Sequence, residues 1–524
     1  MLDKLIQAAE VPEKGLDETI NEWFTPIADA WGNIVLFRVF DIPMIIILLV
    51  GGAAFFTVYF AFINIRRFPL AINVVRGKYD DIEQGGDPVT TTNLNVVDGD
   101  IVDTIRIEGH QGEVSHFQAL ATAVSGTVGL GNIAGVALAI ALGGPGATFW
   151  MIICGLLGMS TKFVECTLGV KYRDVGEDGT VYGGPMYYMT KGFKEIGKAG
   201  TGKVVASIFA ILCVGASFGG GNAAQSNQAA SQLASLMGLS GGNSGTIIGI
   251  VIAVLVGIVI IGGIKRIASV TEKVVPFMAV LYIGASLFII LSHVNLLGTA
   301  FGQIFSQAFT PQAGLGGIMG VLIVGFQRAA FSNEAGAGSA AIAHSAVKTK
   351  YPASEGIVAL LEPFIDTVVI CTMTALVIII YNMNGVFEYG SGNVIIEGQS
   401  VEGSVLTSMA FGDVIPWFPY LLTIAIILFA ISTMISWSYY GLQAWMYLFG
   451  KSKLADLSYK VLFLIFIVIG SAANMSAVWG FSDAMILALV FPNMFTLIFL
   501  FPKVKEELNR YLDAIKVKRF FNPN

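Results

Sequence analysis

The chain has 524 residues, of which 55% are hydrophobic and only 13% are charged. A soluble globular domain carries roughly 25% charged residues, so this composition excludes water as the main solvent of most of the chain. The formal net charge of −6 averages over both sides of a membrane and therefore indicates no particular partner.

The N-terminal segment, residues 1–42, mixes acidic residues with large apolar ones between Ile20 and Trp31. This spacing predicts a short helix lying at the membrane interface. We expect the segment to be extracytoplasmic and to be followed by a transmembrane helix over residues 43–63.

Apolar runs long enough to cross a bilayer recur along the rest of the chain, since about 20 apolar residues are needed for each crossing. The sequence predicts an all-α integral membrane protein with about 11 transmembrane helices. The expected spans are 43–63, 117–142, 147–170, 204–236, 245–263, 275–293, 316–343, 355–381, 414–447, 460–474 and 483–502.

Basic residues occur only in alternate loops of this arrangement. Lys and Arg are present in the polar loop 64–115 and in the tail 503–524, whereas the long stretch 382–412 contains neither. Because cytoplasmic loops accumulate Lys and Arg, we expect a cytoplasmic C-terminus and, for an odd number of spans, an external N-terminus. The expected location is the plasma membrane, the inner membrane of a prokaryote.

Two spans contain the same polar, glycine-rich pattern. Residues 125–132 read SGTVGLGN and residues 332–339 read SNEAGAGS, and the two copies lie five spans apart. An odd number of spans between them predicts that the two helices cross the membrane in opposite directions. This is typical of an inverted repeat, in which helices broken at mid-membrane expose backbone groups to substrate and cations.

Glycine permits such breaks, but it also permits close packing of membrane helices, and both interpretations of these motifs stay open. Polar neighbours favour a binding role, because unsatisfied hydrogen-bonding groups are costly at membrane depth. Those neighbours are Thr127, Asn132, Ser332, Asn333 and Glu334.

Together with FAISTMISWSYYG at 429–441, these motifs resemble the alanine or glycine:cation symporter family over residues 43–503. The resemblance implies a LeuT-like fold with one additional N-terminal helix and two inverted five-helix repeats, at residues 116–295 and 296–502. It also implies sodium as the co-transported ion and small neutral amino acids, alanine and glycine, as substrates.

We expect the substrate to lie at the two breaks and against side chains from neighbouring spans. Gln225 could equally bond to neighbouring helices, Phe331 could equally be core, and Trp437 could belong to the interfacial aromatic belt. The expected substrate-binding residues are Thr127, Gly129, Gly131, Asn132, Gln225, Phe331, Ser332, Gly336, Gly338 and Trp437.

The resemblance to LeuT-like sodium symporters also implies an ion site. The carbonyl groups of Ser125 and Val128 and the hydroxyl groups of Ser432 and Thr433 are its expected ligands. The alternative for both hydroxyl groups is a hydrogen bond to the preceding helical turn.

Other ionisable residues lie within apolar segments and require partners. We expect Arg328 to pair with Glu362 or Asp366, either as a helix lock or as a gate. Glu334 is either a cation ligand or an acceptor for backbone amides exposed by the second break.

Three other functions compete with sodium symport. An enzyme is disfavoured because the four histidines form no HExxH motif and no phosphate-binding loop occurs. An ion channel is disfavoured because channel pores assemble from repeated filters. A proton-coupled or other small-solute transporter remains the main alternative. We expect the lipid bilayer as partner, no nucleic acid and no organic cofactor, and the sequence leaves the oligomeric state open.

Overall fold

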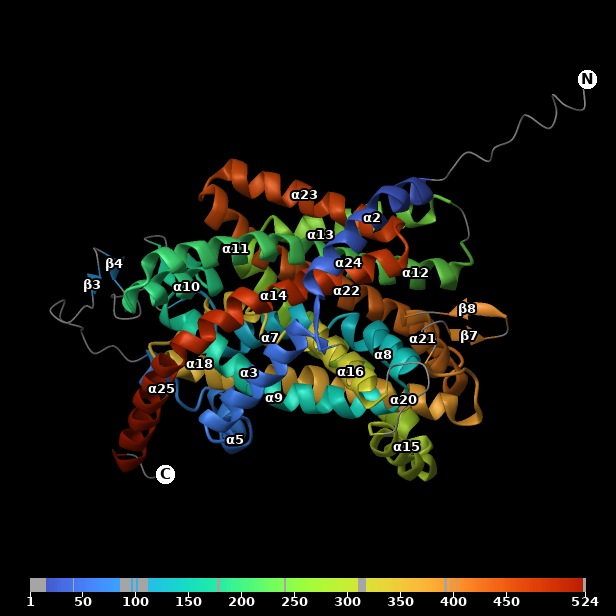
Figure 1. Ribbon diagram of the computed structural model, residues 1–524, viewed down its shortest axis with the longest axis horizontal. Helices are drawn as coiled ribbons and strands as arrows, with labels where there is room; N and C mark the ends of the chain where they lie inside the picture. Colours follow the sequence, from blue (N-terminus) through green and yellow to red (C-terminus); the bar gives the residue numbers. More distant parts are fainter. Residues whose placement is uncertain are drawn as a thin grey trace, which may run out of the picture.

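A computed structural model describes residues 16–521 except 41, 85–95, 98–99, 102–111, 177–179, 240–241, 310–316, 391–393, 397 and 402. The described part is mostly helical, and many of its long helices run along the length of the molecule (Figure 1). One end of the molecule carries α10, α18 and the last turns of α25. The opposite end carries the β7–β8 hairpin, α8 and α15 (Figure 1).

The N-terminal part begins with the predicted helix at Ile20–Trp31, which forms part of α2. Phe24 of this helix packs against Phe481 with ring centroids 5.3 Å apart. Much of the polar loop predicted at 64–115 lies outside the described residues. The helices of this part are α2 (Leu16–Val35), α3 (Met44–Tyr59), α4 (Ile63–Arg66), α5 (Phe68–Val75) and α6 (Asp80–Gln84).

The next group of helices contains the first glycine-rich motif, where α7 and α8 are separated by a break and bent by 51°. Helix α7 begins with a capping box, in which the Ser115 hydroxyl accepts the Gln118 N–H and the Gln118 side chain accepts the Ser115 N–H. The helices are α7 (His116–Thr127), η3 (Gly131–Gly135), α8 (Val136–Gly143), α9 (Gly146–Lys171), α10 (Pro185–Glu195), α11 (Ala199–Phe218), η4 (Gly219–Ala223), α12 (Ala224–Met237), α13 (Ser244–Ile260) and α14 (Gly263–Ser292).

The last group contains the second motif, between α16 and α17. The predicted span 483–502 begins inside α24, so Asp483 lies well within that helix and not at its start. The helices are α15 (Val294–Gln307), α16 (Ile318–Asn333), α17 (Ala340–His344), α18 (Pro352–Val358), α19 (Leu361–Pro363), η5 (Phe364–Cys371), α20 (Thr372–Tyr381), η6 (Asn382–Asn384), α21 (Gly403–Val414), α22 (Phe418–Phe449), α23 (Lys453–Ala472), α24 (Met475–Ala488) and α25 (Val490–Phe521).

Within the described residues, four short antiparallel hairpins lie outside the helical core. The longest pairs Val394 with Val401, Ile395 with Ser400 and Ile396 with Gln399. The strands are β1 (Arg38–Val39), β2 (Ile42–Pro43), β3 (Val96–Val97), β4 (Asp100–Ile101), β5 (Asp174–Val175), β6 (Val181–Tyr182), β7 (Val394–Ile396) and β8 (Gln399–Val401).

Three π-helical segments, η3, η4 and η5, interrupt the helices close to the two motifs. Such wide turns are frequent at functional sites. In η4, a Cβ atom on Gly221 would lie 2.2 Å from the ring of Trp437, so only glycine allows the two helices to approach this closely. The glycine-rich motifs alone do not predict these segments.

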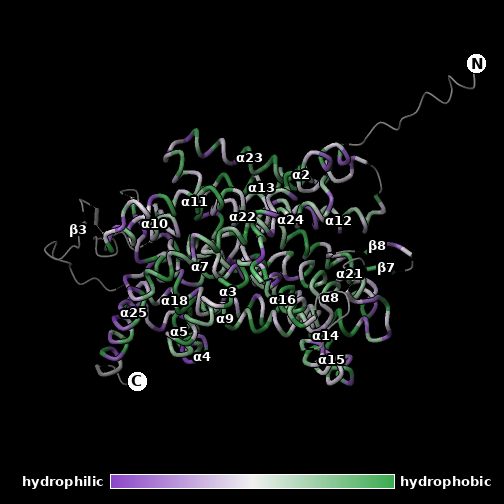
Figure 2. Tube along the Cα trace, in the orientation of Figure 1, coloured by the Kyte–Doolittle hydropathy of each residue, from purple (hydrophilic) through white to green (hydrophobic). Residues whose placement is uncertain are grey.

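Hydrophobic residues follow the central helices, and hydrophilic ones gather in the last turns of α25 (Figure 2). Within the described residues, seven helices or helix runs are long and apolar enough to cross a membrane, and the bent pair α7 and α8 makes eight. Shorter apolar helices cover Met44–Tyr59, Ser244–Ile260 and Ile318–Asn333. The predicted all-α membrane fold is confirmed, whereas the count of eleven spans and the repeat boundaries stay predictions.

Candidate functional site

At the first break, backbone N–H groups donate hydrogen bonds to the oxygen atoms of side-chain amides. Helix α7 ends at Thr127 and the chain turns helical again at Gly131. The Gly129 N–H donates to Asn132 Oδ1 at 2.9 Å, and the Leu130 N–H donates to Gln225 Oε1 at 3.0 Å. Because buried N–H groups must be paired, this break depends on one amide of its own helix and one from α12.

Glycine is required at this break because side chains from three other helices approach it. A Cβ atom on Gly129 would lie 2.5 Å from Thr433 Oγ1 and 2.9 Å from Gln225 Oε1. One on Gly131 would lie 3.3 Å from the Phe331 ring. The structure therefore brings these five predicted residues together.

A hydrogen-bonded cluster of Asn132, Ser332 and Asp366, which we call the Asn132 cluster, connects the first motif to the second and to η5. Asn132 Nδ2 donates to Ser332 Oγ at 3.0 Å and to Asp366 Oδ1 at 2.6 Å. The Ser332 hydroxyl donates to Asp366 Oδ2 at 2.7 Å. Asp366, which the sequence analysis assigned to another partner, thus belongs to this cluster.

The four residues expected to bind sodium lie on facing parts of α7 and α22, and three of them form hydrogen bonds between these two helices. Thr433 Oγ1 donates to the Ser125 carbonyl at 2.9 Å, and the Ser125 hydroxyl donates to the Ser432 carbonyl at 2.9 Å. The Ser432 hydroxyl instead donates to the Phe429 carbonyl of its own helix at 3.0 Å. Val128 lies at the end of α7 in an extended conformation.

These donor atoms are all oxygens, which fits a hard cation such as sodium. The Ser125 carbonyl oxygen and Thr433 Oγ1 lie side by side next to the helix break. The Thr127 hydroxyl does not point to these groups, because it donates to the Ala123 carbonyl of the preceding turn at 3.3 Å.

The second break differs from the first in its backbone and in its neighbours. Glu334, Gly336 and Gly338 have φ angles of +54°, +95° and +80°, the left-handed region that favours glycine. The Gly336 N–H donates to Glu165 Oε1 at 2.9 Å. Asn493 Nδ2 donates to the same carboxylate oxygen at 2.7 Å and to the Gly336 carbonyl at 2.7 Å.

Gly336 and Gly338 are packed against other helices and not against the first break. A Cβ atom on Gly336 would lie 2.6 Å from a Leu49 methyl group, and one on Gly338 would lie 2.9 Å from Pro185. The geometry therefore does not bring these two predicted residues into the Asn132 cluster.

Trp437 joins the second break to α22. Its indole N–H donates to Glu334 Oε1 at 3.0 Å, and the Ser339 hydroxyl donates to the other carboxylate oxygen. Trp437 is fully buried, so it is not an interfacial aromatic residue. Glu334 accepts from these two side chains, whereas it is Glu165 that accepts the exposed N–H of Gly336.

The partner expected for Arg328 is wrong. Arg328 pairs with Asp483 of α24, while Glu362 pairs with Lys162 of α9 at 3.0 Å. The prediction failed because Asp483 was placed at the end of a span, where it required no buried partner.

A cavity of about 390 Å³ lies beside the Arg328–Asp483 pair. Its wall includes Ala137 and Ala141 of α8 and Trp479 of α24. None of the residues predicted to bind substrate or sodium lines this cavity. Sequence reasoning missed it, since its walls come from α8, α16, α21, α24 and the β7–β8 hairpin.

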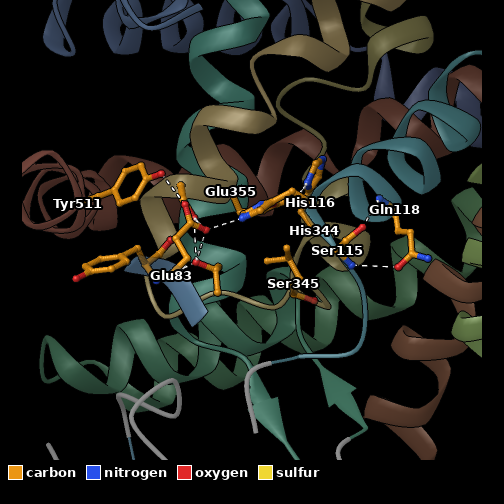
Figure 3. A network of polar contacts seen from close by, with 12 residues as sticks. Glu83, Ser115, His116, Gln118, His344, Ser345, Glu355 and Tyr511 are labelled. Atoms are coloured by element: carbon orange, nitrogen blue, oxygen red, sulfur yellow. Dashed lines mark hydrogen bonds and ion pairs between the residues drawn. The ribbon is translucent and has the colours of Figure 1, made fainter. Parts of the chain in front are cut away.

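Buried charged groups form a chain at the start of α7 and the end of α17, away from the two breaks. We call this chain, which runs from Glu83 through His116 to Lys162, the His116 network (Figure 3). His116 Nε2 lies 2.5 Å from Glu83, and its Nδ1 contacts Glu355. His344 Nδ1 lies 2.5 Å from the other oxygen of Glu355, and its Nε2 lies 3.5 Å from Glu362.

Lys162, bonded to Glu362, completes this network, in which acidic and basic groups alternate from Glu83 to Lys162. Both nitrogens of each imidazole face carboxylates, the arrangement of a protonated histidine. Tyr511 of α25 donates to Glu83 at 2.6 Å, so the C-terminal helix is attached to the network (Figure 3). From the sequence, the four histidines are only seen to lack an HExxH motif, and no role is predicted for them.

Comparison with known proteins identifies the family of this chain. The family model of the sodium:alanine symporter family matches residues 30–521. The chain belongs to this family. The resemblance inferred from the motifs is therefore confirmed.

Two relatives and one solved structure are similar to this chain over most of its length. The sodium/alanine symporter AgcS of Methanococcus maripaludis is 37% identical over 475 residues, covering 90% of this chain and 95% of AgcS. The probable sodium/glutamine symporter GlnT of Bacillus subtilis is 34% identical, covering 75% and 77%. A crystal structure of MhsT in complex with L-phenylalanine is 15% identical with a TM-score of 0.48, covering 76% of this chain and all of that one.

Membership identifies the protein as a multi-pass membrane transporter, a cation-coupled amino-acid symporter and not an enzyme. The contacts described above are therefore those of a transport protein. Their assignment to a particular substrate and ion is a separate step.

Proposed function

We propose that this chain is a sodium-coupled symporter that imports small neutral amino acids, chiefly alanine and glycine, by alternating access. The observation that carries this proposal is the first helix break, where the Ser125 carbonyl and Thr433 Oγ1 lie 2.9 Å apart. Beside this pair, the backbone at Gly129 is unwound, and its N–H donates to the side chain of Asn132. Unwound backbone of this kind binds sodium and a substrate carboxylate in transporters.

Substrate size follows from the same break. Thr433 and Gln225 already approach the position of a Gly129 Cβ atom to 2.5 and 2.9 Å, which leaves little room for bulk. The nearest carboxylate, Asp366, is held by Asn132 and Ser332. A short, uncharged side chain fits this surrounding best, and alanine and glycine have the shortest.

The test is uptake of labelled alanine and glycine by purified protein in liposomes, with sodium and proton gradients imposed separately. We expect uptake to follow the sodium gradient. Uptake that follows only the proton gradient would replace sodium with the alternative, proton coupling, which the buried acids and histidines of the His116 network favour. Absence of uptake of either amino acid under both gradients would overturn the proposal.

Thr433 and Ser432 test the ion site. Thr433→Ala removes an oxygen beside the Ser125 carbonyl, and a lost contact of about 1.4 kcal/mol corresponds to about tenfold weaker apparent sodium affinity. Ser432→Ala is expected to have a smaller effect, because that hydroxyl donates to the Phe429 carbonyl. Ser438→Ala is the matched control, since its hydroxyl donates to the Ile435 carbonyl one turn back. Unchanged sodium dependence in Thr433→Ala would contradict this placement of the ion.

The orientation proposed has the N-terminus outside and the C-terminus in the cytoplasm. Single cysteines at Ser400, in β8, and at Lys516, in α25, are suitable probes because the four native cysteines are buried. An impermeant thiol reagent applied to intact cells is expected to label position 400 and not position 516. The reverse pattern would invert the topology.

A further inference from the structure

A groove of about 170 Å³ lies between α7, α14 and η5. The side chains that line it are all apolar, and they include Leu120 and Val124 of α7, Val275 and Ala279 of α14, and Ile370 of η5. The groove shares no described lining residue with the cavity beside the Arg328–Asp483 pair. It is therefore a separate feature, which neither the proposed ion site nor the proposed substrate contacts use.

The rim of the groove is exposed, whereas its floor is buried. Phe117 at the rim is 45% exposed, and Val128 and Ile370 at the floor are each 1% exposed. Along α14 the rim continues into Phe277 and Val280, which are 60% and 73% exposed. Large apolar side chains exposed in this way on a membrane transporter face the lipid. The groove is therefore continuous with the surface that contacts the bilayer.

Water does not suit a groove with this lining. A buried water molecule requires roughly two to four polar partners, whereas an apolar cavity of about 150 Å³ stays dry and takes up small hydrocarbons. An empty groove would deprive the side chains that line it of dispersion contacts. An apolar molecule from the bilayer therefore fits the groove best.

A basic residue lies beyond one end of the groove. Lys273 is exposed and precedes Pro276 of the wall by about one helical turn. The neighbouring carboxylate of Glu272 is bonded to Gln118 of α7 at 2.8 Å. In the proposed orientation this end of α14 is cytoplasmic, where lysine side chains attract the phosphate groups of lipids. The charge at Lys273 therefore complements a phospholipid whose chain enters the groove.

We propose that the groove binds one acyl chain of a phospholipid from the cytoplasmic leaflet, with the phosphate group of this lipid at Lys273. The chain packs against Leu120 and Val124 and supports α7 as far as Val128, next to the first break. Three elements surround the chain, so this contact differs from that of a lipid lying against a single exposed helix.

The experiment locates the acyl chain by photolabelling. The full chain is reconstituted in liposomes containing a phosphatidylglycerol with a diazirine on its acyl chain, and labelled residues are quantified by mass spectrometry after irradiation. We expect strong labelling of Leu120 and Val124, which are buried and which a lipid reaches only through the groove.

Two substitutions on α14 compare a filled groove with an open one. Ala279→Trp places a large ring in the groove, so we expect it to reduce the labelling of Leu120 and Val124 at least fivefold. Gly284→Trp is the matched control on the same helix, because nothing lies within 4 Å of a Cβ atom there. It is expected to leave the labelling of α7 unchanged.

Lys273→Gln tests the position of the head group. We expect this variant to reduce labelling by the phosphatidylglycerol probe at least threefold. Labelling by a diacylglycerol with the same diazirine chain should not change, since that probe has no phosphate group. Equal labelling of the parent and Lys273→Gln by the phosphatidylglycerol probe would overturn the assignment of the phosphate to Lys273.

Lipid-exposed residues of α13 show in each variant that the protein is folded and embedded, because they contact bulk lipid. Labelling of Leu120 and Val124 that is weaker than that of α13, or that persists in Ala279→Trp, would overturn the site. This outcome is separate from the transport proposal, which is decided by uptake of alanine and glycine. The α13 residues are Ile247, Val251, Val254 and Ile258.

Discussion

The two glycine-rich breaks have similar sequences but different surroundings. At the first break, the neutral amides of Asn132 and Gln225 accept the backbone N–H groups. The second is lined by carboxylates, with Glu165 accepting the Gly336 N–H and Glu334 bonded to Trp437. Neutral amides suit an exchangeable ligand, whereas carboxylates that accept hydrogen bonds from the backbone and from neighbouring side chains suit a fixed contact between helices. We therefore propose that the first break binds ligands and that the second break serves helix packing.

The strongest test of this difference is bulk at the first break. Gly129→Leu would place its side chain where Thr433 and Gln225 lie, and we expect loss of sodium-driven alanine uptake with the protein still folded. Gly284→Leu is the matched control, because nothing lies within 4 Å of a Cβ atom there. Normal uptake by Gly129→Leu would mean that this glycine serves only packing.

At the second break, we expect a substitution of glycine to lower the stability of the protein. Gly336→Ala forces an alanine to φ +95° and brings its Cβ atom to 2.6 Å from Leu49, so we expect destabilisation of about 1 to 3 kcal/mol. Gly385→Ala carries the same kind of backbone strain at φ +72° with no neighbour within 4 Å. Thermal unfolding in detergent compares the two variants. Equal melting temperatures would show that contact with Leu49 contributes nothing.

The smallest effect is expected from Glu165→Gln. Glutamine keeps an oxygen that can accept from the Gly336 N–H and from Asn493, so apparent sodium and alanine affinities should change less than about threefold, under 1 kcal/mol. Glu165→Ala removes the acceptor and should lower the melting temperature clearly. A large loss of sodium affinity in Glu165→Gln would instead give the second break a direct part in ion binding.

The local features of the site could be predicted from the sequence. Both breaks follow from their glycines, and the approach of Thr433 and Ser125 followed from the family resemblance. Both are encoded in short segments. The positions of the two helix breaks could therefore be predicted from the sequence.

Long-range charge pairing was harder to predict. Arg328 pairs with Asp483, and Asn132 donates to Asp366. The residues close to each of these positions in the sequence do not indicate which of several buried acids will face a given helix. A misplaced helix boundary hid the depth of Asp483. His116 and His344 were missed because each was considered alone, whereas their shared partner Glu355 gives them a role.

The contact between Tyr511 and Glu83 has a consequence for the synthesis of the protein. It joins a helix near the start of the chain to one near its end, and Lys171 is tied to the same C-terminal helix through Glu507 at 2.8 Å. A ribosome releases the chain from its N-terminus, so Glu83 can contact Tyr511 only after α25 has been made. The His116 network can therefore bind to the C-terminal helix only after nearly the whole chain has been translated.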